Sequence, residues 1–276
     1  MNKRVTNWIA LGALWAAALT TVGVLGTLLL YVIINGIGAL SLRFIFSAPE
    51  GVRMEGGIWP TIVATVYVTG LAMLIVTPIA VFAAVYLAEY ARQGRLVGTI
   101  RFAADTLASV PSIVMGLFGL ALFVEALGLG FSMISGALAL SFLMLPIVMR
   151  TTEEAIRSVP KYIRWGSYGL GATKWQTVRK VVLPAASPRI ITGIILATGR
   201  AVGETAVVIF TMGTMINTPI LPLDPGRSMT VHLYILAMEG INLPAAYGTA
   251  LLLVAMILGF NLLARFIVRR NRRMMG

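Results

Sequence analysis

Six long stretches of the sequence contain almost no charged residues, and this feature restricts the possible fold more than any other. They cover residues 8–34, 58–87, 106–124, 128–149, 190–215 and 245–264. Crossing the roughly 30 Å of hydrocarbon in a bilayer takes about 20 helical residues at about 1.5 Å each. Each stretch has about this length, and only the fifth carries charges, Arg200 and Glu204. The pattern predicts an all-α membrane protein with six transmembrane helices, in a single domain over residues 1–276.

The overall composition excludes a water-soluble protein. Apolar residues make up 58% of the chain and charged residues only 12%, so a soluble domain could not bury enough of its apolar surface. The net charge of +12 would indicate a nucleic-acid partner in a soluble protein, but in a hydrophobic chain it indicates basic residues at a membrane face, so no nucleic-acid partner is expected. With no Cys and a single His, His232, we expect no metal or redox cofactor in this chain.

The basic residues are distributed very unevenly between the segments that join the six stretches. Eighteen of the 22 Lys and Arg fall on one predicted side, whereas the other side has only Arg43, Arg53 and Arg227. Basic residues concentrate on the cytoplasmic side of membrane proteins. We therefore expect both termini in the cytoplasm, together with a large basic segment over residues 150–189.

Arg200 and Glu204 are the two charges inside a predicted span. If that helix begins near residue 190, Arg200 lies about 15 Å along its axis, close to the middle of the bilayer. A lone charge at this depth costs at least about 2.5 kcal/mol, and an Arg–Glu pair at i, i+4 reduces that cost. Two interpretations follow. The pair fixes helix packing, or Arg200 offers its guanidinium to an anion crossing the membrane while Glu204 orients it.

Two glycines flank this arginine. Gly199 and Gly203 are four residues apart, a spacing of small residues that allows helix backbones to approach closely in membranes. We expect this face of the span to pack tightly against another span or against a partner subunit.

The basic segment over residues 150–189 contains a recognisable loop pattern. Gly171 is followed by nine residues and then by Val181-Val182-Leu183-Pro184. This resembles the loop of bacterial ABC importer permeases, which reads Glu-Ala-Ala, three residues, Gly, nine residues, Ile, any residue, Leu-Pro. Trp165-Gly166-Ser167 stand where that family has Glu-Ala-Ala. On composition alone, the segment would equally suit a basic face lying on the membrane surface.

The resemblance implies that this loop docks on a cytoplasmic ATPase subunit. The acidic residue that makes this contact in many relatives is replaced by Trp165, so the contacts are expected to differ in detail. The residues assigned to the coupling of the two subunits by this resemblance are Arg164, Trp165, Gly166, Ser167, Gly171, Ala172, Leu183 and Pro184.

Further blocks in the same order resemble the PstA-type permease of the phosphate-specific ABC importer, over roughly residues 55 to 266. They are Gly56-Gly57-Ile58-Trp59-Pro60, Tyr86-Leu87-Ala88-Glu89-Tyr90, Val110-Pro111-Ser112-Ile113, Arg150-Thr151-Thr152-Glu153-Glu154 and Gly199-Arg200-Ala201-Val202-Gly203-Glu204-Thr205-Ala206. The resemblance implies a type I importer permease fold in a prokaryotic cell membrane. It also implies that Arg150, at the end of the fourth stretch, is a second contact for the anion.

The same resemblance implies a set of partners. They are a PstC-type sister permease, two copies of the ATPase and an extracytoplasmic phosphate-binding protein, with inorganic phosphate as substrate. The sequence has no G-x-x-x-x-G-K-[ST] loop, so ATP and Mg are expected on the partner ATPase and the chain itself is not expected to be an enzyme.

Three other functions remain open from the residues alone. A permease for another oxyanion, such as sulfate or molybdate, would keep the same loop and the same arginine. A proton-coupled carrier would need several acids inside the membrane, and Glu204 is the only clear one. A structural scaffold would leave the buried charges without a role.

Overall fold

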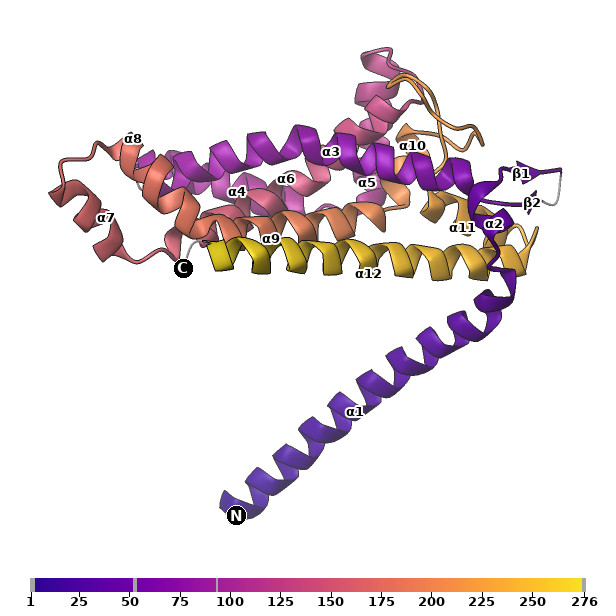
Figure 1. Cartoon of the computed structure of the whole chain (residues 1–276), viewed down its shortest axis with the longest axis horizontal. Helices are drawn as coiled ribbons and strands as arrows, with labels where there is room; N and C mark the ends of the chain where they lie inside the picture. The colour runs from indigo at the N-terminus through magenta and orange to yellow at the C-terminus, as the bar shows by residue number, and fades with distance from the viewer. Residues whose placement is uncertain (1–2, 52–53, 93, 275–276) are drawn as a thin grey trace.

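Figure 1 shows the computed structural model, which describes residues 3–51, 54–92 and 94–274. The side chains of residues 3–6, 263–265 and 267–274 are outside the described part, and so are the basic side chains predicted near the two ends. The α-helices are α1 (Lys3–Gly36), α2 (Leu42–Phe46), α3 (Trp59–Val85), α4 (Arg95–Ser109), α5 (Ser112–Gly119), α6 (Met133–Arg157), α7 (Lys161–Gly169), α8 (Lys174–Thr177), α9 (Leu183–Val202), α10 (Ala206–Thr211), α11 (Met229–Met238) and α12 (Leu243–Met274).

Shorter elements connect or extend these helices. They are the 3-10 turn η1 (Ile37–Ala39), the π-helical segments η2 (Tyr86–Tyr90), η3 (Leu120–Ala126) and η4 (Val178–Val182), and the strands β1 (Pro49–Glu50) and β2 (Glu55–Gly56). The two strands form a small antiparallel hairpin in which Pro49 pairs with Gly56.

Within the described residues, five helical segments are long and apolar enough to cross a membrane. They are Asn7–Ala39, Trp59–Tyr90, Met133–Arg157, Lys174–Val202 and Leu243–Leu262. A sixth is reached if the pair Arg95–Ser109 and Ser112–Ala126 counts as one broken span. The predicted all-α membrane fold is therefore confirmed, but not every predicted boundary.

The third predicted span, residues 106–124, is not one straight helix. Its first residues belong to the end of α4, and the axis turns by 101° before α5. The turn lies at Val110, whose backbone is extended, and at Pro111. Proline has no N–H to donate and disfavours a helical residue before it, so the helix ends there although the run stays apolar. Pro78, by contrast, is accommodated inside α3.

The boundaries of the fourth and fifth predicted spans also differ from the uncharged runs. The fourth helix, α6, begins at Met133 and extends through the charged residues to Arg157. The fifth run, 190–215, is two helices, because α9 ends at Val202 and α10 begins at Ala206. An uncharged run indicates which residues lie in apolar surroundings, but it does not show where a helix ends. The end depends on local residues such as Gly203, because glycine has a low helix propensity.

The core lies where α3 packs along α6, with α9 beside α6 (Figure 1). Every fourth residue of α3 is buried, in the series Ala64, Val68, Ala72, Val76, Ala80 and Ala84. A four-residue spacing makes one ridge along a helix, and small residues on it bring the facing helix close. The hydroxyl of Ser141 in α6 donates to the carbonyl of Ala72 at 3.1 Å, which joins the two helices at mid-length.

The bundle has two different ends (Figure 1). One end carries α7 and α8 together with the last turns of α12, and the other carries α2, the hairpin and α11. Helix α1 diverges from the bundle and contacts it near the tight approach of Gly36 to the backbone of Tyr247. Its most hydrophobic window is entirely unburied in the chain.

Candidate functional site

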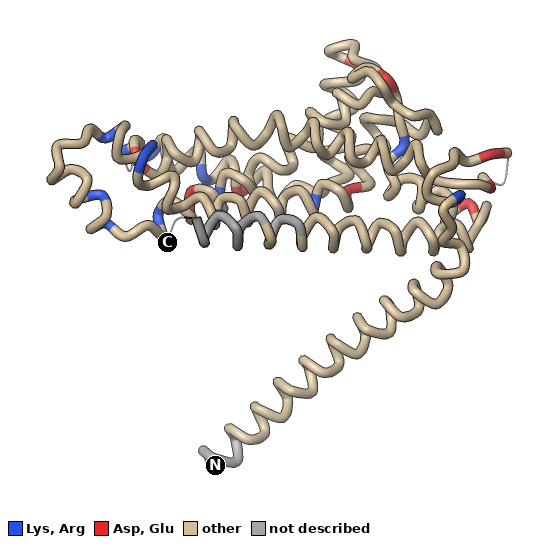
Figure 2. The backbone as a smooth tube through the Cα atoms, viewed as in Figure 1, with Lys and Arg blue, Asp and Glu red and all other residues tan. Residues whose placement is uncertain are grey.

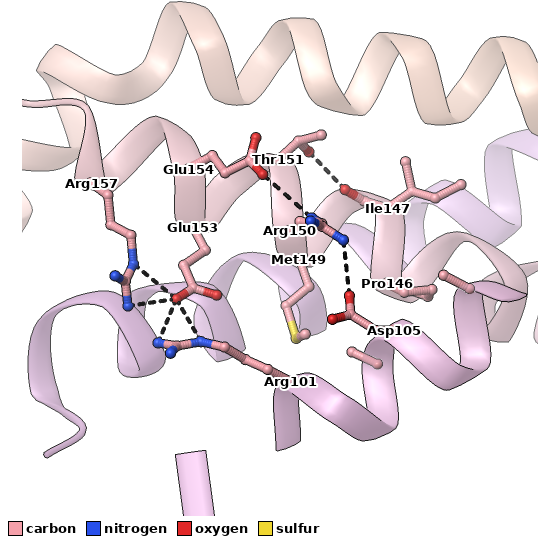
Figure 3. A pocket seen from close by; sticks show the side chains of 12 residues that line it. Arg101, Asp105, Pro146, Ile147, Met149, Arg150, Thr151, Glu153, Glu154 and Arg157 are labelled. Carbon is pink, nitrogen blue, oxygen red and sulfur yellow. Dashed lines mark hydrogen bonds and ion pairs between the residues drawn. The ribbon is translucent and has the colours of Figure 1, made fainter. Parts of the chain in front are cut away.

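A pocket of about 550 Å3 lies between α4 and α6, and half of the residues that line it are charged (Figure 3). Its charged lining residues are Arg101, Asp105, Arg150, Glu153, Glu154 and Arg157. They come from two helices whose charges recur at i, i+4, so that each helix presents them on one face. The tube in Figure 2 shows that the Lys and Arg in the described part gather mainly in the half of the bundle nearer α7.

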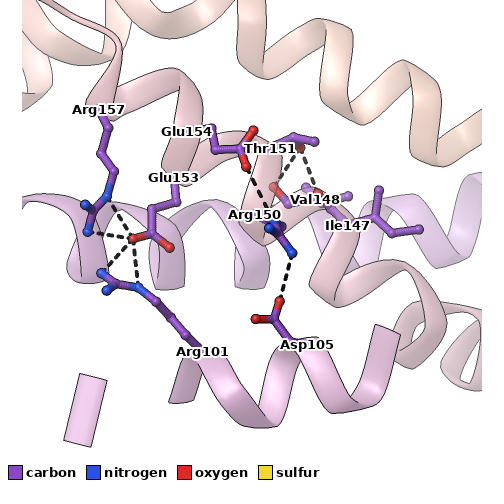
Figure 4. A network of polar contacts seen from close by, with 9 residues as sticks. All are labelled: Arg101, Asp105, Ile147, Val148, Arg150, Thr151, Glu153, Glu154 and Arg157. Atoms are coloured by element: carbon purple, nitrogen blue, oxygen red, sulfur yellow. Dashed lines mark hydrogen bonds and ion pairs between the residues drawn. The ribbon is translucent and has the colours of Figure 1, made fainter. Parts of the chain in front are cut away.

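Arg150 lies between two carboxylates in this pocket (Figure 4). Its Nη1 donates to Oδ1 of Asp105 on α4 at 3.0 Å, and its Nε donates to Oε1 of Glu154 at 3.4 Å. All three side chains are exposed, Arg150 by 67% and Asp105 by 58%. Exposed ion pairs contribute only about 0–1 kcal/mol, so another anion can replace a carboxylate at Arg150 at little cost.

Glu153 organises the other half of the pocket. Its Oε1 accepts from Nη2 of Arg101 at 2.8 Å and from Nη2 of Arg157 at 2.9 Å, with Nε of each arginine also in hydrogen-bond range. The Glu153 side chain is only 11% exposed. This carboxylate therefore fixes α4 to α6, whereas Arg150 beside it stays accessible.

The charges of the pocket balance: three guanidinium groups face three carboxylates. A guanidinium offers five N–H donors in a planar fork that matches the oxygens of phosphate or carboxylate. Because Arg150 and its partners are exposed whereas Glu153 is buried, the arrangement can accept a small oxyanion at Arg150 without losing the contact between the two helices.

Arg200 occupies the last turn of α9, and Glu204 lies beyond the end of that helix. The predicted i, i+4 pair on one helix face is therefore wrong: among the described residues, no ion pair joins the two. The backbone carbonyl of Glu204 instead accepts from the hydroxyl of Thr230 in α11 at 2.9 Å, which holds the break in place. The Arg200 side chain is exposed, and α9 ends well short of the end that α3 and α12 reach (Figure 1).

The two glycines beside Arg200 have no close neighbour within this chain. A Cβ built on Gly199 would meet nothing within 4 Å, and one on Gly203 would meet only backbone of its own helix turn. The predicted close packing of this face therefore does not occur with another span of the described chain.

The eight residues predicted to couple to an ATPase divide into two groups. Trp165 and Gly166 lie in α7, and Gly171 and Ala172 lie in the turn between α7 and α8, where Gly171 has a φ of +81° that favours glycine. The Trp165 side chain is 67% exposed at this end of the bundle. Of the other four, Arg164, Ser167 and Leu183 are partly buried, whereas Pro184 is exposed.

The partly buried residues of the second group are fixed by specific contacts. Ser167 shares a hydrogen bond of 2.9 Å with the hydroxyl of Thr177, and Leu183 packs against a second apolar cluster around Val178 and Val182, one residue before Pro184. Arg164 turns inward as well, since its side chain is only 15% exposed and pairs with Glu89 in η2 at 2.7 Å.

At the opposite end, Arg227 and His232 form a buried polar contact. Nη1 of Arg227 lies 3.5 Å from Nδ1 of His232, and Nε of Arg227 donates to the carbonyl of Thr214 at 2.6 Å. Burial, and secondarily the Arg227 charge, lower the pKa of His232 to about 4, so this imidazole is neutral at physiological pH. His232 is therefore a buried packing residue rather than a surface one.

Six charged residues of the pocket and of the Arg164 contact were not predicted as site residues: Arg101, Asp105, Glu153, Glu154, Arg157 and Glu89. Arg101 and Asp105 are i, i+4 on α4, and Glu153 and Arg157 are i, i+4 on α6. That spacing was available in the sequence as a sign of one charged face on each helix. The pairing of the two faces was not, because it depends on how α4 folds back along α6.

An apolar helical bundle with a charged pocket between two of its helices has the architecture of a membrane transport protein. Residues 77–273 match the family described as binding-protein-dependent transport system inner membrane component. The chain belongs to this family, and it is therefore a multi-pass membrane component of a transport system.

Known relatives agree with this assignment. The chain is 39% identical to the probable ABC transporter permease protein YqgI of Bacillus subtilis, covering 97% of this chain and 96% of YqgI. It is 37% identical to the phosphate transport system permease protein PstA 1 of Mycobacterium tuberculosis, covering 80% and 74%. It is 36% identical to PstA of Haemophilus influenzae, covering 76% and 74%. The resemblance to PstA-type permeases is thus confirmed.

Solved structures share the fold at low sequence identity. A chain of a bacterial alginate ABC transporter has a TM-score of 0.71 at 14% identity, covering 96% of this chain and 95% of its own. A chain of the inward-facing MetNI methionine ABC transporter has a TM-score of 0.62 at 22% identity, covering 78% and 94%. These similarities confirm the type I importer permease fold.

Proposed function

We propose that this chain is the PstA-type permease subunit of an ATP-driven importer that moves inorganic phosphate into the cytoplasm. Its relatives of 36–37% identity are named as phosphate transport permeases. The observation that carries the proposal is Arg150, an exposed guanidinium in a pocket between two helices, held only by exposed carboxylates. Such a guanidinium can bind a phosphate dianion in place of one of its carboxylate partners and then release it again.

The partners follow from the family. A PstC-type sister permease completes the path, two copies of a cytoplasmic ATPase bind ATP and Mg, and an extracytoplasmic binding protein delivers phosphate. The open face at Gly199 and Gly203 suits a close approach by the sister permease, because no part of the described chain fills it.

In the proposed orientation across the membrane, α7, α8 and both termini lie in the cytoplasm. The distribution of basic residues supports it, since eighteen of 22 lie in segments assigned to that side. In this orientation the exposed side chains of Trp165 and Trp175 face the ATPase.

Transport proceeds by alternating access. ATP binding closes the ATPase dimer, and the resulting motion of α7 and α8 opens the path outward, where phosphate leaves its binding protein. Arg200, in the last turn of a helix that ends inside the bundle, contacts the anion first. After hydrolysis resets the bundle, phosphate meets Arg150, where Asp105 and Glu154 compete with it and favour release.

Uptake of radiolabelled phosphate by the assembled complex tests this proposal. Arg200→Gln is expected to abolish uptake while the subunits still co-purify. Arg189→Gln is the matched control, since Arg189 is an exposed arginine about three turns earlier on the same face of α9, and it is expected to leave uptake unchanged. Normal uptake by Arg200→Gln would disprove the role of Arg200, and competition by sulfate in the unsubstituted complex would overturn the choice of phosphate.

A further inference from the structure

Helix α7 is attached to the end of α3 through one buried ion pair. Nη2 and Nε of Arg164 both donate to Oε1 of Glu89, at 2.7 and 3.1 Å. The side chains are 15% and 8% exposed, which makes this the most buried ion pair in the described part of the chain. Glu89 lies in η2, the π-helical continuation of α3.

The same guanidinium also binds the backbone at the end of α6. Its Nη2 donates to the carbonyl of Ile156 at 2.8 Å, and its Nη1 donates to the carbonyl of Val159 at 2.5 Å. Both carbonyls belong to the chain where α6 ends and turns toward α7. One side chain of α7 therefore holds both the end of α3 and the end of α6, the two helices that form the core interface.

A second, weaker contact joins the next short helix to the same segment. The Nζ of Lys174, at the start of α8, lies 4.9 Å from the centre of the Tyr90 ring. Tyr90 is the residue after Glu89, so η2 contacts both α7 and α8. Cation–aromatic contacts at exposed sites contribute about 0.5–1 kcal/mol, which makes this contact an addition to the ion pair and not its equal.

The opposite side of α7 is exposed in the described part of the chain. Tyr162 and Trp165 have side chains exposed by about two thirds, on either side of Arg164 in sequence. A short helix that presents aromatic rings outward and a buried arginine inward has two separate contact faces. Movement of the outer face must reach the bundle through the inner one.

We propose that Glu89 and Arg164 are a positioning pair that transmits the motion of the coupling segment to α3 and α6. The proposal rests on the proposed function, because it takes α7 as the segment that an ATPase moves. In it, the pair makes α7, η2 and the end of α6 move as one unit. Because α6 also carries Arg150, displacement of α7 reaches the pocket through a continuous helix. Neither residue contacts the anion.

The test measures phosphate moved per ATP hydrolysed by the assembled complex in liposomes, with binding protein present. Glu89→Gln keeps the shape but removes the charge, and it is expected to lower this ratio at least fivefold while hydrolysis stays within twofold. Glu89→Gln combined with Arg164→Met removes both charges and leaves no unpaired buried ion, and it is expected to show the same uncoupling. Arg179→Gln is the control, because it removes an exposed cation from the same segment and should leave the ratio unchanged.

The outcomes separate the two proposals. An unchanged ratio in both Glu89 variants would overturn the coupling role, and so would an equal fall in transport and hydrolysis. Failure of both variants to assemble would make the pair purely structural and would also overturn it. If the unsubstituted complex transports another oxyanion, the choice of phosphate fails, and the coupling ratio is then measured with that ion.

Discussion

Two ion-pair regions at the same end of the bundle are built from the same residue types but differ in burial. The pair of Arg164 and Glu89 is 15% and 8% exposed, whereas Arg150 and Asp105 are 67% and 58% exposed. The buried arginine also binds two backbone carbonyls, whereas the hydrogen bonds of the exposed one within the described residues go to carboxylate side chains. Burial makes an ion pair costly to break, and exposure makes it easy to exchange. The first arrangement suits a fixed mechanical contact and the second a transient anion site.

The largest expected effect comes from removing one member of the buried pair. Glu89→Ala leaves Arg164 without its carboxylate and is expected to destabilise the purified complex by about 3–5 kcal/mol. This loss of stability is measured by thermal unfolding in detergent, with the dissociation of the subunits as the signal. A change below 1 kcal/mol would remove the distinction between the two regions.

The buried polar contact between Arg227 and His232 extends the comparison to the other end of the bundle. The pKa of His232 is lowered to about 4 by burial and by Arg227, against about 6.5 when unfolded. The neutral form is favoured in the folded state, so this stabilisation is complete above about pH 6.5 and is lost as the pH falls toward 4. The loss is expected to be on the order of 3 kcal/mol.

Unfolding measured between pH 7 and 4 tests this, with His232→Gln as the comparison variant. The variant cannot take up the proton, so its stability is expected to depend less on pH in this range. Identical pH profiles for the two proteins would contradict the assignment.

In the exposed region, Arg150→Gln is expected to separate stability from transport. The substitution removes two exposed ion pairs, so the complex should lose no more than about 1 kcal/mol of stability. Transport should nevertheless fall at least tenfold, because the anion loses its guanidinium contact. Uptake assays and thermal unfolding of the same preparation give both numbers, and a parallel loss of both would make Arg150 an ordinary structural residue.

The smallest expected effect is that of Glu154→Gln. The Arg150–Glu154 pair is an exposed i, i+4 contact with a donor–acceptor distance of 3.4 Å. Such pairs contribute about 0.3–0.5 kcal/mol. Unfolding should therefore change by no more than this amount, and a loss comparable to that of Glu89→Ala would show that exposure does not govern these pairs.

The sequence predicted those features of the fold that depend only on the residues within one helix, such as its length and its apolar character. The first, second and last apolar runs each coincide with one helix long and apolar enough to cross a membrane, because a span requires about 20 uncharged residues whatever lies beside them. The breaks at Pro111 and Gly203 were harder to predict. Proline inside α3 is accommodated, so the residue type alone does not separate a kink from a break.

The candidate sites were predicted only where one short segment carries the signal. Arg150, Arg200 and the α7–α8 turn each stand out in a single stretch of sequence. The pairs Glu89–Arg164, Arg101–Glu153 and Asp105–Arg150 join residues 75, 52 and 45 positions apart. No periodicity within one helix encodes such a contact, since it depends on the packing of α3, α4 and α7 around α6.

The row of buried alanines and valines along α3 has a consequence for the kind of movement the bundle allows. Small, smooth side chains at an interface interdigitate shallowly, so two helices can shift along their axes without large rotamer changes. The hydrogen bond from Ser141 to the carbonyl of Ala72 is a single polar contact on that surface. The α3–α6 contact therefore favours shear over separation, and a bulky residue at Ala72 or Ala80 would act as a wedge that stops the sliding.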